Sequence, residues 1–275
     1  MPGVPFEMKR MWEREVEPKL QAMSDSVIVS RTLKVLGLGE SRVEEMVKDL
    51  ILGANPTLAP YAKSDGIHLR ITAKASNRLE ATALIEPLEA QVRQRLGGLI
   101  YGMDDETPSS VVSRLLYESH FRFVVLEIGE GAIGSVAQSL GSHPLCHCVL
   151  SGRDLAVVAE ALGVERVGST GDIDTICREA LSKFGADLCL GVLVEQQVQR
   201  RSAPGIQASE DKGAVQFSAQ IVTLESGAAR QANHSSQSWR TARSEVARLV
   251  GLAALNHLRG TLTELTKSEE LSARA

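Results

Sequence analysis

Apolar and polar positions alternate along residues 67–74, and around this segment apolar residues recur three and four positions apart. The alternation predicts a strand with one buried face and one solvent-exposed face. A further strand is predicted over 27–37. A stretch with helical spacing follows each of these strands, so we expect residues 27–103 to form a small α+β domain.

Local signals predict where the helices of this first region begin. Ser41 and Glu44 have the spacing of a capping box, and Asn77 with Glu80 predicts the start of a second helix. The segment 1–26, ahead of the first strand, is helical in character and too short to form a domain.

The run 104–106 is acidic and predicts a hinge. Thr107 as N-cap and Pro108 at the first helical position then open a new helix. The pattern that follows predicts a layered α/β domain over 104–266 and a frayed tail over 267–275. Its predicted elements are strand 121–128, helix 131–140, strand 145–150, helix 153–162, helix 172–184, strand 187–194, strand 214–223 and helix 240–264. The fold class is therefore α/β, with a small α+β domain in front.

Composition narrows the possible partners. Hydrophobic residues make up 43% of the 275 positions, charged residues 23%, and the formal net charge is −4. A general polyanion-binding role is not favoured, and no apolar run approaches the length needed to cross a bilayer. The four cysteines lack the spacing of a disulfide framework, so we expect a reduced, cytoplasmic protein.

The glycine spacing after the strand 121–128 fits a dinucleotide-binding turn. Gly129, Gly131 and Gly134 form a GxGxxG sequence, whose backbone N–H groups and following helix could meet a pyrophosphate. Asp154 lies roughly where such a site has an acid. No second βαβαβ half follows, so the spacing also fits a glycine-containing turn with no ligand.

The segment 143–148 combines imidazoles with thiols, which suit zinc. A tetrahedral site draws ligand pairs from separated places, and neither Cys177 nor Cys189 has a histidine nearby. The alternative is a strand with Cys146 and Cys148 on one buried face. We predict no metal and no cofactor.

The hydroxyl and guanidinium groups give no clear catalytic pattern. No serine lies in a nucleophile elbow, although Ser135 and Ser151 flank the glycine-rich turn. Three arginines are expected near the start of the last helix, where they could bind a phosphate or form a solvent-exposed helix face. They are Arg240, Arg243 and Arg248.

Several motifs resemble those of the competence-damage-inducible (CinA-like) family, from Met1 to about Thr266. They are the PGVPxEM-like start at 2–8, GxGES at 37–41, NPTxAxYA at 55–62, LRITA at 69–73 and Tyr101-Gly102. The resemblance implies that 27–103 is a KH-type domain. It also implies that 104–266 corresponds to a domain that, in active members, hydrolyses nicotinamide mononucleotide to nicotinic acid mononucleotide and ammonia.

The chain departs from that family where the reaction would occur. The family pattern AESCTGG has its expected nucleophilic serine where this chain has Ile128. The tyrosine and lysine of YSNxxK are missing from 150–155, and the TGxxGP turn is missing from 193–198. Isoleucine can neither donate a proton nor attack an amide, and losing a nucleophile assembly typically costs on the order of a millionfold in turnover.

Three hypotheses follow. The first is a catalytically inactive homologue with a structural or regulatory role and a vestigial pocket. The second is an active amidohydrolase with Ser135 or Ser151 as a displaced nucleophile. The third is a nucleotide sensor that uses the glycine-rich turn. The vestigial pocket residues are Glu127, Gly129, Gly131, Ser151 and Arg240.

The resemblance also implies partners: a homodimer, a nicotinamide mononucleotide-like ligand, and a molybdopterin-binding-type domain encoded as a separate chain. The segment 1–26 is expected to be a remnant able to complete that domain. A KH domain clamps RNA with a GxxG loop, but Glu40 stands where the second glycine of Gly37-Leu38-Gly39 would be needed. A nucleic-acid partner is not expected.

Overall fold

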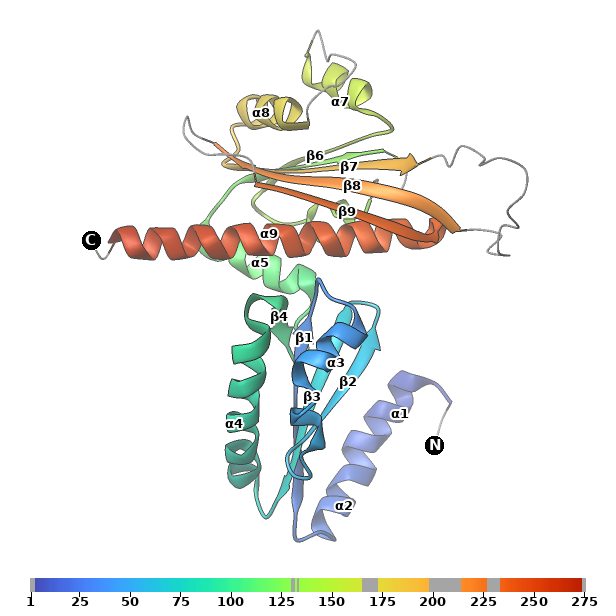
Figure 1. Cartoon of the computed structure of the whole chain (residues 1–275), viewed down its shortest axis with the longest axis vertical. Coiled ribbons are helices and arrows are strands. Elements are labelled where there is room, and N and C mark those ends of the chain that lie inside the picture. The colour runs from blue at the N-terminus through green and yellow to red at the C-terminus, as the bar shows by residue number, and fades with distance from the viewer. Residues whose placement is uncertain are drawn as a thin grey trace. The chain divides into compact units, whose positions relative to one another are not determined.

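The computed structural model describes residues 3–129, 132, 134–164, 173–197, 214–226 and 233–273. The chain divides into two compact units, Met1–Glu106 and Thr107–Ala275. Each unit is built around its own sheet, of four and five strands (Figure 1).

Unit 1 begins with a run of helix, as expected from its sequence. Helix α1 (Pro5–Met11) continues through a π-helical turn, η1 (Trp12–Val16), into α2 (Glu17–Ala22). No described residue between Gly3 and Leu20 is buried.

The rest of unit 1 is a βαββαβ arrangement. Its sheet has the order β2-β3-β1-β4 with every neighbouring pair antiparallel, which is the ferredoxin-like topology. The elements are β1 (Val27–Val35), α3 (Glu40–Val47), η2 (Leu50–Leu52), β2 (Thr57–Lys63), β3 (Gly66–Ala75), α4 (Arg78–Leu96), η3 (Gly97–Leu99) and β4 (Ile100–Met103). The small α+β domain is thereby confirmed.

The alternation along 67–74 is confirmed in β3. Leu69 and Ile71 are fully buried, whereas Arg70 and Lys74 on the other face are exposed. Strand β2 was not expected from the sequence, because its TLAPYAK pattern includes Pro60 and lacks a clean alternation.

The two predicted helix starts of unit 1 have different outcomes. Asn77 caps α4, and its side-chain oxygen accepts a hydrogen bond from the Glu80 N–H at 2.9 Å. The capping box at Ser41 and Glu44 is wrong. Helix α3 has Gly39 as its N-cap without any side-chain cap, so Ser41 lies inside the helix.

Unit 2 is a five-stranded sheet between two layers of helix. The sheet has the order β6-β5-β7-β8-β9; its first three strands are parallel, and the last two are antiparallel to their neighbours. The elements are α5 (Pro108–Ser119), β5 (Phe123–Ile128), α6 (Ala137–Leu140), β6 (Cys146–Gly152), α7 (Leu155–Leu162), α8 (Ile173–Phe184), β7 (Leu188–Gln197), β8 (Ala214–Glu225), β9 (Asn233–Ala242) and α9 (Arg243–Ala273). The layered α/β prediction is confirmed, as is Thr107 as the N-cap of α5, where it also forms a capping box with Ser110.

Two predicted helices of unit 2 differ from the structure. The helix over 131–140 shortens to α6, because Gly134 has φ +85° and the chain turns before Ala137. The last helix begins at Arg243, since the residues just before it form β9, which carries only Trp239 as a large apolar side chain. Helix α9 continues to Ala273, past the predicted end of the helix and into the predicted frayed tail.

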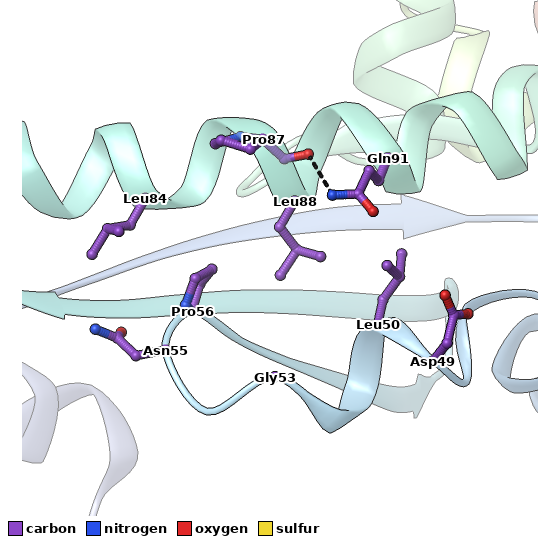
Figure 2. A pocket seen from close by; sticks show the side chains of 9 residues that line it. All are labelled: Asp49, Leu50, Gly53, Asn55, Pro56, Leu84, Pro87, Leu88 and Gln91. Atoms are coloured by element: carbon purple, nitrogen blue, oxygen red, sulfur yellow. Dashed lines mark hydrogen bonds between the residues drawn. The ribbon is translucent and has the colours of Figure 1, made fainter.

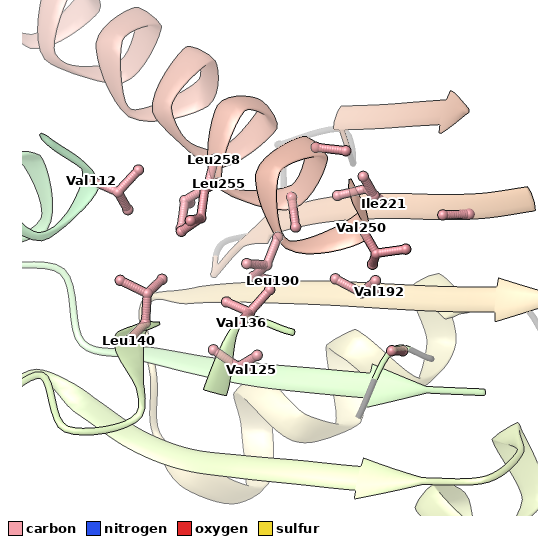
Figure 3. Packing of buried hydrophobic residues seen from close by; sticks show 14 of the residues in the cluster. Val112, Val125, Val136, Leu140, Leu190, Val192, Ile221, Val250, Leu255 and Leu258 are labelled. Carbon is pink, nitrogen blue, oxygen red and sulfur yellow. The ribbon is translucent and has the colours of Figure 1, made fainter. Parts of the chain in front are cut away.

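The central strands β5 and β7 of unit 2 are buried on both faces. Helices α5, α6 and α9 cover one face over Val125, Leu190 and Ile221 (Figure 3). Helices α7 and α8 cover the other face over Val124, Leu126 and Cys189. Alternate residues of β5 thus enter opposite cores, as a strand buried on both sides requires.

No helix of the described residues is both long enough and apolar enough to cross a membrane.

Two neighbouring valines of α7 test this arrangement. Val158 is 1% exposed and Val157 is 44% exposed. We expect Val158→Ala to lower the free energy of unfolding by about 2 kcal/mol, because it leaves a small void in the core. Val157→Ala should change it by less than about 0.5 kcal/mol. Equal losses for the two variants in urea unfolding would contradict the packing of α7.

Candidate functional site

The strongest candidate site lies at the carboxyl ends of β5 and β6. The chain leaves β5 on the face of α6 and leaves β6 on the face of α7 and α8. Adjacent parallel strands whose connections depart to opposite faces create a crevice at their carboxyl ends, which is where open α/β sheets bind ligands.

Glu127 is the central side chain of this crevice, and it is completely buried. Its oxygen Oε1 accepts hydrogen bonds from the Val136 N–H at 2.5 Å, the Ala137 N–H at 3.2 Å and the Ser135 hydroxyl at 3.0 Å. Its Oε2 accepts from the Gly134 N–H at 2.8 Å and the Ser151 hydroxyl at 3.3 Å. Five donors therefore surround one carboxylate.

This arrangement uses the hydrogen-bonding capacity of the carboxylate. Two carboxylate oxygens offer about four lone-pair sites, and five donors exceed that number. The peptide N–H groups of Gly134, Val136 and Ala137 are those that a glycine-rich turn would offer to a bound phosphate. Here the chain's own Glu127 takes them.

Ser135 and Ser151 are brought together by Glu127, since both hydroxyls donate to its carboxylate. Neither hydroxyl bonds to a histidine or a lysine within the described part of the chain. A serine attacks an amide only after a base accepts its proton, and the carboxylate beside these two already accepts three peptide N–H groups. In this geometry neither serine hydroxyl has a base available to accept its proton.

Ile128 points away from this cluster. Its side chain is fully buried in the core formed with α7 and α8, where it lies with Val158, Ile176 and Leu193. Ile128 stands where the family pattern has its nucleophilic serine, and this position is therefore part of an apolar core.

Gly129 has a steric role in the structure. Its φ is +101°, its N–H donates to the Gly152 carbonyl at 2.9 Å, and a Cβ built on it would lie 1.9 Å from the Val194 carbonyl oxygen. The glycine allows β5 to continue between its two neighbouring strands. Gly131, the second glycine of the spacing, lies outside the described residues.

The arginines do not gather at Glu127. Arg240 is exposed on β9 and pairs with Gln216 of β8, three strands away from β5. The sheet register puts it roughly 20 Å from Glu127. Arg248 pairs with Glu245 on α9, and the Arg243 side chain lies outside the described part.

The cysteine and histidine cluster does not form a metal site. A bulge at His147 shifts the register of β6, so Cys146 packs into the α9-side core and Cys148 into the α8-side core. The prediction that both cysteines share one face is wrong for this reason. Burial raises the pKa of both thiols, which favours the neutral form over the metal-binding thiolate. No group of three or more potential ligands is arranged for a metal within the described ranges.

Asp187 and Arg122 form an ion pair at the opposite, amino edge of the sheet. The Arg122 guanidinium donates to both carboxylate oxygens at 2.8 and 2.9 Å and lowers the pKa of Asp187 below its usual range. The pair ties the start of β5 to the start of β7. It lies at the other end of the strands from Glu127.

A hollow of about 310 Å³ lies in unit 1 between α4 and the loop before β2 (Figure 2). Leu84, Leu88 and Pro56 give it an apolar lining, and its polar side chains are engaged elsewhere. Asp49 pairs with Arg95, and the Asn55 amide exchanges two hydrogen bonds with the Lys74 backbone. It shows no catalytic grouping.

The groups that complete the crevice could not be predicted from residue types. They are the backbone N–H groups of Gly134, Val136 and Ala137 and the carbonyl of Val194. Backbone groups leave no trace in residue identity, and only the glycine spacing hinted that the chain turns tightly here.

Comparisons with known proteins point to one family. A family model described as the KH domain of damage-inducible protein CinA matches residues 30–102, which confirms the KH-type domain. A putative competence-damage inducible protein of Clostridium beijerinckii is 41% identical over 208 residues, covering 75% of this chain and 46% of that protein. One from Clostridium perfringens is 38% identical over 206 residues, with the same shares covered.

This chain thus spans about half the length of the curated relatives it matches. Among solved structures, a competence or damage-inducible protein from Enterobacter asburiae is similar over 57% of this chain and 99% of that one, at 12% identity and a TM-score of 0.39.

Replacing Glu127 tests its role in the turn. Glu127→Gln keeps the shape but turns one acceptor oxygen into an NH₂ group that faces N–H donors. We expect the free energy of unfolding to fall by about 2–4 kcal/mol. Glu160→Gln, on the exposed face of α7, is the control and should cost less than about 0.5 kcal/mol. A loss at Glu127 no greater than at Glu160 would refute the role.

The glycines allow a second test. Gly129→Ala and Gly134→Ala both place a side chain at positive φ, which costs about 1–2 kcal/mol. Only Gly129→Ala also creates an overlap with Val194, because nothing lies near a Cβ at Gly134. We expect Gly129→Ala to be the more destabilising by at least about 2 kcal/mol in denaturant unfolding. Equal effects would show that the contact with Val194 is unimportant.

Proposed function

The chain belongs to the competence-damage-inducible (CinA-like) family, and from this premise we propose that it is a member without catalytic activity. It is a homologue of nicotinamide mononucleotide deamidases that acts as a structural or regulatory protein. The observation that carries the proposal is the contrast between two neighbours on β5. Glu127 is fully hydrogen-bonded by the turn, and Ile128 is buried in an apolar core.

Amide hydrolysis needs a nucleophile, a base and donors for the oxyanion. The crevice keeps peptide N–H groups of the kind that could stabilise an oxyanion, but these bond to Glu127. A ligand anion would have to displace a buried carboxylate, which would leave that charge unpaired at a cost of several kcal/mol. This supports a vestigial pocket over a working site.

The two rival functions have less support. An active enzyme with Ser135 or Ser151 as nucleophile would need a base other than Glu127, whose oxygens are occupied. A nucleotide sensor would need the N–H groups of the glycine-rich turn to be available. The engagement of Gly134, Val136 and Ala137 with Glu127 weighs against it.

The proposal extends to location and partners. We place the protein in the cytoplasm, where its four free cysteines stay reduced. A separately encoded molybdopterin-binding-type domain stays as a proposed partner, whereas a mononucleotide-like ligand belongs to the rival sensor function. What the longer relatives bind or catalyse applies to this chain only as a proposal.

Turnover gives the direct test. Purified full chain, incubated with nicotinamide mononucleotide, should release no ammonia above the uncatalysed rate, while an active family member assayed alongside does. Thermal shift with the same ligand should show no stabilisation. Ile128→Ser should not create activity either, because the new hydroxyl would be buried beside Val158 and Ile176.

Ammonia release by the unmodified chain would overturn the proposal. Loss of that activity in Ser135→Ala or in Ser151→Ala would then identify the displaced nucleophile. Stabilisation by the ligand without turnover would support the sensor function.

A further inference from the structure

Unit 1 has one sheet face that its packed helices, α3 and α4, leave uncovered. These helices pack against the other face, over Leu33, Leu69 and Ile71. The side chains of the uncovered face come from three neighbouring strands and are exposed or half-buried. They are Ile28, Ser30 and Thr32 on β1, Thr57, Ala59 and Tyr61 on β2, and His68, Arg70, Thr72 and Lys74 on β3. We call this set the open face.

The open face carries positive charge without negative charge. None of the four strands of the sheet contains an Asp or a Glu, although the chain has 34 acidic residues among 275. Arg70 and Lys74 are exposed on this face, and Lys63 is exposed where β2 ends. Asp65 and Asp104, at the ends of the strands, already accept hydrogen bonds within unit 1. Cations gathered on one face of a chain with net charge −4 indicate an anionic partner.

A flat pair of side chains lies among these charges. The guanidinium carbon of Arg70 is 5.0 Å from the centre of the Tyr61 ring, and an Arg70 N–H donates to the Tyr61 hydroxyl at 2.9 Å. The two contacts hold the planar guanidinium group against the ring, and Tyr61 remains 38% exposed. Unpaired bases of nucleic acids stack on aromatic rings and on arginine planes. The Tyr61–Arg70 pair therefore suits a polyanion that also has flat rings.

Hydroxyl groups lie beside this pair. Ser30, Thr72 and Thr57 form a row across the three strands, because the register sets Thr72 opposite both of the others. The Ser30 and Thr72 hydroxyls are 2.9 Å apart, and the Thr57 hydroxyl donates to the Thr72 carbonyl at 3.4 Å. Each hydroxyl can both donate and accept. The ribose 2′-hydroxyl, which distinguishes RNA from DNA, offers the same two capacities to a partner.

We infer that the open face binds single-stranded RNA, with a base stacked on the Tyr61–Arg70 pair and phosphates held by Lys63 and Lys74. A duplex fits less well, because its bases are already stacked on one another and are not free to stack on a side chain. An acidic peptide could use the cations, but it has no regular series of flat rings for the Tyr61–Arg70 pair.

The open face is distinct from the loop by which a KH domain clamps RNA. That loop would correspond to residues 37–40, which join β1 to α3 and lack the second glycine. The absence of a GxxG clamp therefore does not bear on the sheet face. The inference goes beyond the proposed function and does not depend on it.

Fluorescence anisotropy with a labelled single-stranded RNA of about 12 nucleotides, titrated with the full chain, tests the inference. We expect a dissociation constant on the order of 10–100 μM at physiological salt. Three exposed cations predict that the logarithm of the binding constant falls with the logarithm of salt concentration with a slope of about −2. Lys74→Ala should weaken binding roughly threefold to tenfold and make this slope shallower by about 0.7. Lys48→Ala, at an exposed lysine that ends α3, is the control and should change binding less than about twofold.

The aromatic ring has its own test. Tyr61→Ala should weaken binding on the order of tenfold, because the stacked base loses its support, whereas Tyr61→Phe keeps the ring and should stay within about threefold. Tyr117→Ala, at a tyrosine of α5 that is 65% exposed, is the matched control and should have less than about a twofold effect. The same RNA annealed to its complement should bind at least about fivefold more weakly. Circular dichroism and thermal unfolding verify that each variant remains folded.

Several outcomes would overturn the inference. They are no anisotropy change at protein concentrations up to about 1 mM, equal effects of Lys74→Ala and Lys48→Ala, and equal effects of Tyr61→Ala and Tyr117→Ala. Single-stranded DNA of the same sequence that binds as tightly as the RNA would refute the role of the hydroxyl row. An oligoglutamate that binds as tightly would show that the face recognises charge alone.

Discussion

The buried carboxylate of Glu127 is the interaction on which the second unit's crevice depends. A charged group without exposure is stable in a protein only when hydrogen bonds replace the water it has lost. Three peptide N–H groups and two hydroxyls provide this replacement, and they come from the turn before α6 and from the next strand, β6. One side chain therefore fixes the path of the chain between two strands and determines which donors are left for a ligand.

The burial of β5 on both faces restricts which of its side chains could take part in a reaction. Because β5 is buried on both faces, its successive residues enter opposite cores: Glu127 faces the turn on the α6 side, and Ile128 faces α7 and α8. Gly129 then passes so close to Val194 that no side chain fits. Two of the three glycines of the spacing have a structural explanation: Gly129 by this close passage and Gly134 by its positive φ, neither of which needs a bound pyrophosphate. The turn thus needs these two glycines for its own geometry.

Much of the fold could be predicted because its strongest strands have clear patterns. The alternation in β3 is typical of a half-buried strand, and the short run of Leu and Val in β7 fits a strand buried on both faces. Strand β9 was missed because NHSSQSWRTA has almost no apolar residues, and its strand conformation comes from pairing with β8. At the site, Glu127 and Gly129 were identified as candidates, but their roles depend on backbone N–H and carbonyl groups that residue identity does not reveal. The shared face expected for Cys146 and Cys148 failed because a single bulge at His147 reverses the alternation.

Hydrogen exchange of the amides of Gly134, Val136 and Ala137 tests the central claim most directly, namely that Glu127 already occupies the anion-binding groups of the turn. The account predicts slow exchange of these three amides in the free chain, at rates close to those of the core strands, with no change on adding nicotinamide mononucleotide. Fast exchange in the free chain that slows only when the mononucleotide is added would contradict it, because the N–H groups would then be available to a ligand.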